Sequence, residues 1–223
     1  MENSLKKRLY NGETVFGTWS MLSSSFVADA IAVSGIDFII IDMEHGAMPF
    51  SVAEEMVRAA QVNHCQPIIR VGDAHENTIL HALETGSNAV MIPHISTSKD
   101  AQVIASYTRY APDGNRGLSP YTRVHGYTHD GLKQSLHRAN ENTLTGVLVE
   151  GEDGIANLPD ILNVNNIDLV YIGVYDLALS AGVAGDIDHP RVKKMMEQCF
   201  GQIKDAGKIA GTFTRSIESS KFL

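Results

Sequence analysis

The sequence is poor in cysteine and has no long apolar run. Its 223 residues include two cysteines, Cys65 and Cys199, which lack the spacing of a metal-binding pair. Two distant thiols are typical of reduced, structural cysteines. No apolar run reaches the length of a membrane span, and the first residues (MENSLKKRLYNGE) lack the apolar centre of a signal peptide. We therefore expect a soluble, cytoplasmic protein without a membrane partner.

Positive charge is also scarce. Lysine and arginine number 18 against 26 aspartates and glutamates, which gives a net charge of −8. This balance argues against a nucleic-acid partner, because the phosphate backbone attracts basic surfaces. With 43% hydrophobic residues, the chain is long enough for one sizeable core. We expect residues 1–223 to form a single domain.

Strand-like and helical patterns alternate along the chain. Apolar runs predict strands, and apolar positions three or four residues apart predict helices. The expected strands are 14–20, 37–42, 67–71, 88–92, 145–150, 168–173 and 208–213. The expected helices are 23–32, 51–62, 76–84, 99–108, 132–138, 154–162, 190–206 and one that begins at Ser216. This alternation predicts an α/β fold with a parallel sheet.

The strand ends favour a closed barrel over an open, doubly wound sheet. Polar residues follow most strands, and the sequence has no glycine-rich nucleotide-binding fingerprint. We predict a (β/α)8 TIM barrel whose eighth strand is absent from this sequence. A gap in a barrel would leave two open edges. We expect either that the natural chain continues beyond residue 223 or that a neighbouring subunit fills the gap.

The stretch 37–46 holds the densest group of ionisable side chains. Its apolar run 38–41 predicts a strand buried on both faces, and Asp42, Glu44 and His45 follow. Because side chains alternate along a strand, Asp42 shares a face with buried apolar residues and needs a partner or a task. The Asp-x-Glu-His set offers acid–base chemistry near neutral pH. An ordinary charged loop is the alternative.

Four further ionisable residues lie at or near later strand ends. Arg70 ends a strand and is suited to a bidentate grip on a carboxylate or an enolate oxygen. Glu84 precedes the fourth strand, Glu150 ends the fifth, and Asp176 follows the sixth. The carboxyl ends of barrel strands meet at one mouth, so we expect these groups to join the Asp-x-Glu-His set there.

Several of these residues allow more than one interpretation. Glu150 and Asp176 suit a hard divalent ion such as Mg²⁺ or Mn²⁺, but they also suit the capping of a loop and a helix. Arg70 alternatively forms a structural salt bridge. We interpret the other eight histidines as surface residues, although His94 follows a strand and is harder to dismiss. The irregular segment 110–129 is long enough to be functional or partner-facing.

Taken together, the motifs resemble the HpcH/HpaI family of divalent-metal-dependent, class II pyruvate aldolases. That family includes 4-hydroxy-2-oxoheptane-1,7-dioate aldolase and 2-dehydro-3-deoxyglucarate aldolase. The resemblance extends from Gly17 to Phe213. It is carried by the segments 17–20, 37–45, 67–71, 83–93, 109–117, 150 with 157–158, and 172–177. Each segment alone is weak, and together they are highly specific.

The resemblance implies a role for each catalytic candidate. His45 matches the base that works with a water on the metal, and Arg70 matches the arginine that binds the pyruvyl unit and steadies the enolate. Asp42 and Glu84 match the groups that orient the histidine. The implied reaction is the retro-aldol cleavage of a 4-hydroxy-2-oxo acid to pyruvate and an aldehyde, with no Schiff-base lysine.

The resemblance also implies ligands and partners. Glu150 and Asp176 match the ligands of Mg²⁺, Mn²⁺ or Co²⁺. The implied substrate-binding residues are Trp19, Arg70, Leu148, Gly173, Val174, Tyr175 and Arg123. Members are usually hexamers built as paired trimers, so we expect a homo-oligomer in which Arg123 reaches a neighbouring subunit.

The sequence departs from the family pattern around the pyruvyl site. Glu84 replaces a common Asp, Leu148 a common Gln, Val174 a common proline and Ala178 a common serine. The sequence therefore does not identify the aldehyde that the reaction releases. Two other functions are also left open: an acyl-CoA lyase of malyl or citramalyl type, against which the charge of −8 argues mildly, and a non-catalytic 2-oxo-acid-binding homologue.

Overall fold

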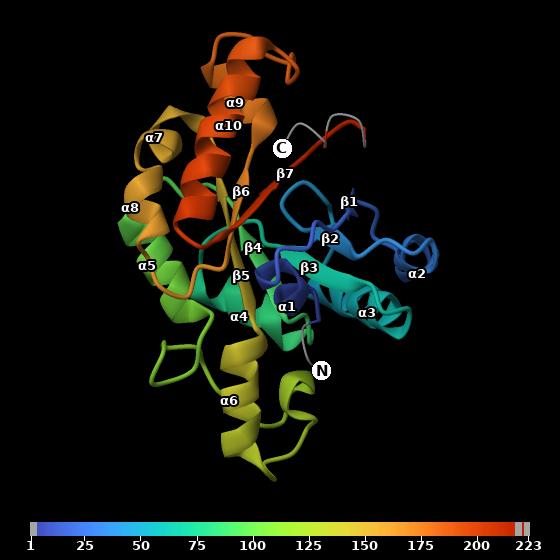
Figure 1. The fold of residues 1–223 in the computed structure, drawn as a ribbon. Coiled ribbons are helices and arrows are strands. Elements are labelled where there is room, and N and C mark those ends of the chain that lie inside the picture. Colours follow the sequence, from blue (N-terminus) through green and yellow to red (C-terminus); the bar gives the residue numbers. More distant parts are fainter. Residues whose placement is uncertain (1–3, 217–219, 221–223) are drawn as a thin grey trace. The chain divides into compact units, whose positions relative to one another are not determined.

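A computed structural model describes residues 4–216 and residue 220, with strands alternating with helices along the chain (Figure 1). The strands are β1 (Gly17–Ser20), β2 (Phe38–Asp42), β3 (Gln66–Arg70), β4 (Ala89–Ile92), β5 (Leu144–Val149), β6 (Leu169–Ile172) and β7 (Ile209–Thr212). The helices are α1 (Ser4–Tyr10), α2 (Ser25–Val33), α3 (Phe50–Val62), α4 (Glu76–Glu84), α5 (Ser98–Tyr107), α6 (Leu132–Asn142), α7 (Gly151–Ala156), α8 (Leu158–Leu162), α9 (Val174–Ser180) and α10 (Pro190–Asp205), with a 3-10 turn η1 (Arg123–His125). The predicted α/β class is confirmed.

The chain divides into two compact units. The first comprises the described part of residues 1–93 together with 104–145, and the second comprises 94–103 with the described part of 146–223. Strand β5 begins in the first unit and continues in the second. Each unit is described by itself below, and the single domain expected from the sequence remains a prediction.

In the first unit, β1 to β4 are parallel and follow one another in chain order. Strands β2 and β3 are buried almost throughout, because branched apolar side chains occupy both faces of this part of the sheet. The register pairs Ile40 with Ile68 and Asp42 with Arg70. The last pair places an acid beside a base at the carboxyl ends of two neighbouring strands.

In the second unit, β5, β6 and β7 are again parallel neighbours. The register pairs Leu148 with Tyr171 and Ile172 with Thr212. Helix α10 lies with β7 and turns its apolar side inward, burying Val192, Met196, Cys199, Phe200 and Ile203. Its spacing of three and four residues is the pattern that predicts this helix from sequence.

All seven predicted strands form, and every strand-to-strand pairing given by the register is parallel. The helix expected over 154–162 is instead two short helices that meet at Asn157. Pro159 sits in the first turn of α8, where a missing N–H is tolerated, whereas it would break a continuous helix. The helix expected from Ser216 lies mostly outside the described residues, and the eighth strand remains a prediction.

Both cysteines are buried and neither forms a disulfide, as expected. Burial raises the pKa of each thiol to about 11, so both stay protonated near neutral pH. Within the part of the chain that the structure describes, no helix combines the length and apolarity needed to cross a membrane.

Candidate active site

The predicted site residues of the first unit centre on an arginine that contacts two acids. Asp42 ends β2 and Arg70 ends β3, and the register places them side by side. The Nε of Arg70 donates to Oδ1 of Asp42 at 2.9 Å, and Nη2 donates to Oδ2 at 2.6 Å. Both residues are buried. This two-point contact fixes the plane of the guanidinium, which a single contact would leave free to rotate.

Two more groups complete the surroundings of the guanidinium. Nη1 of Arg70 lies 2.9 Å from Oε2 of Glu44. The ring of Trp19 in β1 lies against the guanidinium, with its centroid 4.6 Å from Cζ. Trp19 therefore contacts the predicted pyruvyl-binding arginine through a cation–π interaction. The sequence predicts both residues for the site but does not predict this contact.

Asp42 also shapes the turn that carries His45. Its Oδ1 accepts from the backbone N–H of Glu44 at 3.0 Å and of His45 at 3.2 Å. Burial alone would raise the pKa of Asp42, but its bonds to Arg70 and to the two amides outweigh burial and lower it. Gly46 closes the turn, since a Cβ there would lie 2.1 Å from the carbonyl oxygen of Asp42. The turn leaves His45 exposed, and its backbone is joined to Arg70 through Asp42.

Glu84 lies at the other end of the strands. It ends α4, which leads into the start of β4, and nearby Ser87 donates to the carbonyl of Pro67 near the start of β3. His45 follows the far end of β2. Five strand residues at about 3.3 Å each separate the two ends by roughly 15 Å. Within one chain, the structure therefore does not bring Glu84 and His45 together.

Arg123 lies near Glu84. Its Nη1 donates to the carbonyl of Thr85 at 2.7 Å, and its Nη2 donates to Oε1 of Gln61 at 2.9 Å. Gly86 makes room for it: at φ +84°, a Cβ there would lie 2.4 Å from Nη1. Arg123 thus holds the end of α4 in its own chain, away from Arg70.

A second group of predicted site residues lies in the second unit. Glu150 directly follows β5, and its side chain is 13% exposed. Its Oε1 lies 2.7 Å from Nδ1 of His94. Its Oε2 faces Gly173, where a Cβ would lie only 2.9 Å away. The backbone N–H of Gly173 donates to the carbonyl of Val149 at 3.1 Å and holds the two strand ends together.

Asp176 belongs to the first turn of α9, directly beyond β6, and is exposed. Val174 and Leu148 are buried, whereas Tyr175 is half exposed and its ring lies 5.7 Å from that of Phe213. Leu148 lies inside β5, two residues before Glu150, and its side chain is apolar. The sequence predicts that all four residues belong to the site, and this remains a prediction.

Glu150 and Asp176 fit a hard divalent ion in donor type, because both offer carboxylate oxygens at the ends of adjacent strands and Asp176 is open to water. Among the described residues, no group of three or more His, Cys, Asp and Glu side chains forms a metal-binding cluster. Water and substrate oxygens would therefore supply the remaining ligands. Arg70 and His45 lie in the other unit, and a single mouth for all these residues remains a prediction.

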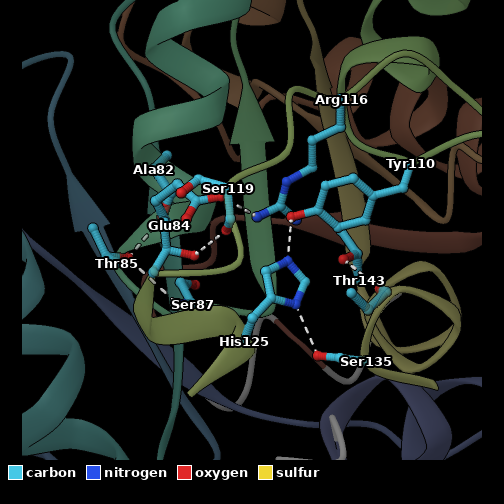
Figure 2. Close-up of polar contacts among 12 residues, drawn as sticks. Ala82, Glu84, Thr85, Ser87, Tyr110, Arg116, Ser119, His125, Ser135 and Thr143 are labelled. Atoms are coloured by element: carbon cyan, nitrogen blue, oxygen red, sulfur yellow. Dashed lines mark hydrogen bonds and ion pairs between the residues drawn. The ribbon is translucent and has the colours of Figure 1, made fainter. Parts of the chain in front are cut away.

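A buried polar cluster in the first unit was not predicted (Figure 2). His125 lies between the hydroxyl of Tyr110, 2.9 Å from Nε2, and the hydroxyl of Ser135, 2.8 Å from Nδ1. Cζ of Arg116 lies 4.6 Å from the centroid of the Tyr110 ring, and its Nη2 donates to Oε1 of Glu84 at 3.0 Å. The interpretation of all eight other histidines as surface residues is therefore wrong for His125, which is 5% exposed.

Burial explains the ionisation of this cluster. Burial and the nearby Arg116 lower the pKa of His125. Burial raises the pKa of Tyr110 to about 12. Both groups are therefore neutral near pH 7. The sequence gives no signal for the cluster, because segment 110–129 lacks the periodicity that separates buried from exposed positions.

Parallel strands that carry acids, a histidine and an arginine beyond their carboxyl ends are typical of an α/β enzyme. The family model described as "HpcH/HpaI aldolase/citrate lyase" matches residues 15–221. The chain belongs to this family, and the resemblance noted from its motifs is confirmed.

Individual relatives agree with this assignment. The chain is 33% identical to a 2-keto-3-deoxy-L-rhamnonate aldolase of Klebsiella pneumoniae, over 95% of this chain and 79% of that one. It is 32% identical to a 4-hydroxy-2-oxo-heptane-1,7-dioate aldolase of Shigella sonnei, over 99% of this chain and 84% of that one. A family protein from Burkholderia cenocepacia has a solved structure with a TM-score of 0.91 and 31% identity, covering 98% of this chain and 87% of that one.

Proposed function

We propose that the protein is a carbon–carbon lyase that cleaves a 4-hydroxy-2-oxo acid into pyruvate and an aldehyde with the help of a divalent ion. The observation that carries the proposal is that Asp42 fixes the guanidinium of Arg70 and also holds the turn that carries the exposed His45. The names of the relatives supply the reaction class, because two of them are called aldolases.

Arg70 is suited to binding an oxyanion. A guanidinium has five N–H groups, and two of those on Arg70 donate to Asp42, while Nη1 forms an ion pair with Glu44. N–H groups on both terminal nitrogens remain to donate to a substrate oxygen. Because Asp42 and Trp19 hold the guanidinium, these donors are oriented before the substrate arrives, which is the condition for strong electrostatic stabilisation.

The chain's own residues divide the reaction between them. His45 takes the proton from the C4 hydroxyl, the C3–C4 bond breaks, and its electron pair forms the enolate of pyruvate while C4 becomes the aldehyde carbon. Arg70 donates to the enolate oxygen. Protonation at C3 completes pyruvate. Glu150 and Asp176 would hold the ion, which when bound supplies positive charge that polarises the ketone.

The test is pyruvate release from a panel of 4-hydroxy-2-oxo acids, coupled to lactate dehydrogenase and run on metal-stripped protein. Release that requires added Mn²⁺ or Mg²⁺, and that is lost in His45→Ala, supports the proposal. Full activity in excess EDTA would refute the role of the ion. Absence of release from every substrate, with Mn²⁺ binding intact, would refute the lyase reaction and favour a binding function.

We also propose that the protein acts as a homo-oligomer in which one chain supplies Glu84 and Arg123 to the site of a neighbour. Support comes from their position: both lie roughly 15 Å, the length of a strand, from the end that carries His45. If Glu84 orients His45, as the resemblance implies, the histidine must belong to another chain.

A further inference from the structure

His94 has a backbone conformation that few residues adopt. It follows Pro93, just beyond β4, and its φ is +59°. This left-handed conformation costs most side chains energy because Cβ crowds the backbone, although histidine tolerates it better than branched residues do. The side chain is 68% exposed, so apolar packing does not account for the conformation. Strained residues of this kind persist where their surroundings fix them, and they gather at functional sites.

The turn that carries His94 is attached to β5. The backbone N–H of Ile95 donates to the carbonyl of Leu148 at 3.1 Å. One residue further, the carbonyl of Ser96 accepts from Nδ2 of Asn157 at 2.9 Å. The first bond holds the turn against the end of β5, and the second holds it against the junction of α7 and α8. The left-handed residue before them then directs its imidazole to the first residue after that strand, Glu150.

The imidazole contacts one oxygen of the Glu150 carboxylate. Nδ1 of His94 lies 2.7 Å from Oε1, while Oε2 lies on the side of Gly173. At this distance the two groups form an ion pair when the imidazole carries both of its protons. A glutamate has three rotatable bonds, so the contact of His94 with Oε1 and the closeness of Oε2 to Gly173 restrict the carboxylate more than the backbone alone does.

We propose that His94 is a positioning residue of the divalent-ion site: it holds Oε1 of Glu150 so that the carboxylate is presented to the ion in one orientation. The inference rests on the proposed role of Glu150 as a metal ligand. Carboxylates that bind metals are commonly held by hydrogen bonds from neighbouring groups, and loss of such a group typically weakens metal affinity 10–100-fold.

Two substitutions separate the side chain of His94 from its backbone. Both His94→Asn and His94→Gly are compatible with φ +59°, because asparagine and glycine favour the left-handed region. Nδ2 of asparagine takes a position close to that of Nδ1 of histidine and can contact Oε1 of Glu150, whereas glycine removes the side chain. If only the backbone conformation of His94 mattered, neither substitution would change metal binding.

The experiment is calorimetric titration of Mn²⁺ into the metal-stripped full chain. We expect His94→Gly to weaken Mn²⁺ binding about 10–100-fold and His94→Asn to retain most of the affinity. We also expect the activity of His94→Gly to recover at high Mn²⁺ concentration. Wild-type affinity in His94→Gly, or an equal loss in both variants, would overturn the inference.

The wild-type titration keeps this inference separate from the proposed function. If wild-type protein does not bind Mn²⁺ and retains its activity in EDTA, the proposed ion site is wrong and the inference falls with it. If wild-type protein binds Mn²⁺ and His94→Gly binds it equally well, only the role of His94 is wrong. Thermal unfolding of the metal-stripped variants shows whether either change destabilises the fold by itself.

Discussion

Arg70 donates two N–H groups to Asp42, pairs with Glu44 and keeps N–H groups on both terminal nitrogens for a substrate, so its planar shape matters as much as its charge. In Arg70→Lys, a single ammonium can contact Asp42 but cannot also hold a fixed pair of donors for the enolate. We expect kcat to fall by roughly 100-fold or more, the usual effect of losing an oxyanion donor. Steady-state pyruvate release measures the loss.

A matched control is Arg58→Lys. Arg58 forms an exposed ion pair with Glu54 four residues earlier in α3, and it lies outside the candidate site. We expect the kcat of Arg58→Lys to equal that of the wild-type protein. If Arg70→Lys also left kcat unchanged, the guanidinium would be a structural salt bridge, as one interpretation of the sequence allows.

His125 makes the stability of the first unit depend on pH. Its pKa is lowered from 6.5 by burial first and by Arg116 second, while Glu84 opposes the shift. The unfolded chain therefore binds the proton more readily than the folded chain does. Stability should decrease as pH falls below about 6.5, the unfolded value, until the folded pKa is passed.

Urea unfolding at a series of pH values measures this effect. In His125→Gln, the decrease just below pH 6.5 should shrink, although stability at pH 8 also falls because the bonds to Tyr110 and Ser135 change. His137→Gln is the control, because His137 is exposed and pairs only at the surface with Glu141. The same pH dependence in wild type and His125→Gln would contradict the assignment.

Sequence alone predicts the residues at strand ends better than their partners. Asp42 and Arg70 are found because the strand period and the parallel sheet bring them to one edge. The contact of Trp19 with Arg70, and of Arg116 with Glu84, depends on how β1 and the segment 110–129 pack, which no local pattern specifies. The family resemblance names Glu84 but does not say where in one chain it lies.

At the scale of elements, the strand end of β6 leaves no room for a side chain beside Glu150. A Cβ on Gly173 would lie 2.9 Å from Oε2 and 3.0 Å from Cβ of Glu150, although its φ of −74° suits alanine. In Gly173→Ala the carboxylate must move. We expect weaker Mn²⁺ binding and a lower kcat, measured by calorimetry and pyruvate release.

Gly201 offers the matched control in α10. A Cβ there meets nothing within 4 Å, and the residue is exposed. Gly201→Ala should leave Mn²⁺ binding unchanged and stabilise the protein by about 0.5–1 kcal/mol, because alanine favours a helix over glycine. Unchanged Mn²⁺ binding in Gly173→Ala would mean that Glu150 does not bind the ion or can move freely.

Elements were predictable where they were long and periodic. Helix α10 and the buried strands follow directly from their apolar spacing. The short helices α1 and α9 were missed, since seven residues give too few turns for a pattern. Helix α9 matters more, because it carries Asp176. Pro159 explains the boundary between α7 and α8, whereas the sequence pattern predicts a single helix through this position.

At the scale of the whole molecule, the alternation of strands and helices determines the parallel sheet, because a crossover helix returns the chain to the same edge. The division into two compact units was not foreseen, since strand β5 is continuous in sequence and contributes to both. The strand and helix pattern also does not predict how chains assemble into an oligomer. Assembly bears on the site, because Glu84 lies far from His45 within one chain.

Subunit complementation tests whether two chains build one site. We expect His45→Ala and Glu84→Gln each to lose activity, and the co-expressed mixture to regain part of it. In the mixture, a chain with an intact His45 can meet a neighbour with an intact Glu84. Glutamine keeps an acceptor for the buried Arg116, so the fold should survive the change. Size-exclusion chromatography with light scattering confirms that mixed oligomers form.

The control is a mixture of His45→Ala with Arg70→Ala. Both residues lie at the carboxyl end of strands in one chain, so no mixed oligomer can bring an intact pair together there. This mixture should stay inactive. Equal recovery of activity in both mixtures would mean that the recovery does not come from a site shared in the proposed way. No recovery in the mixture of His45→Ala with Glu84→Gln would contradict a shared site. Full activity of Glu84→Gln alone would show that this carboxylate does not serve His45 in any chain.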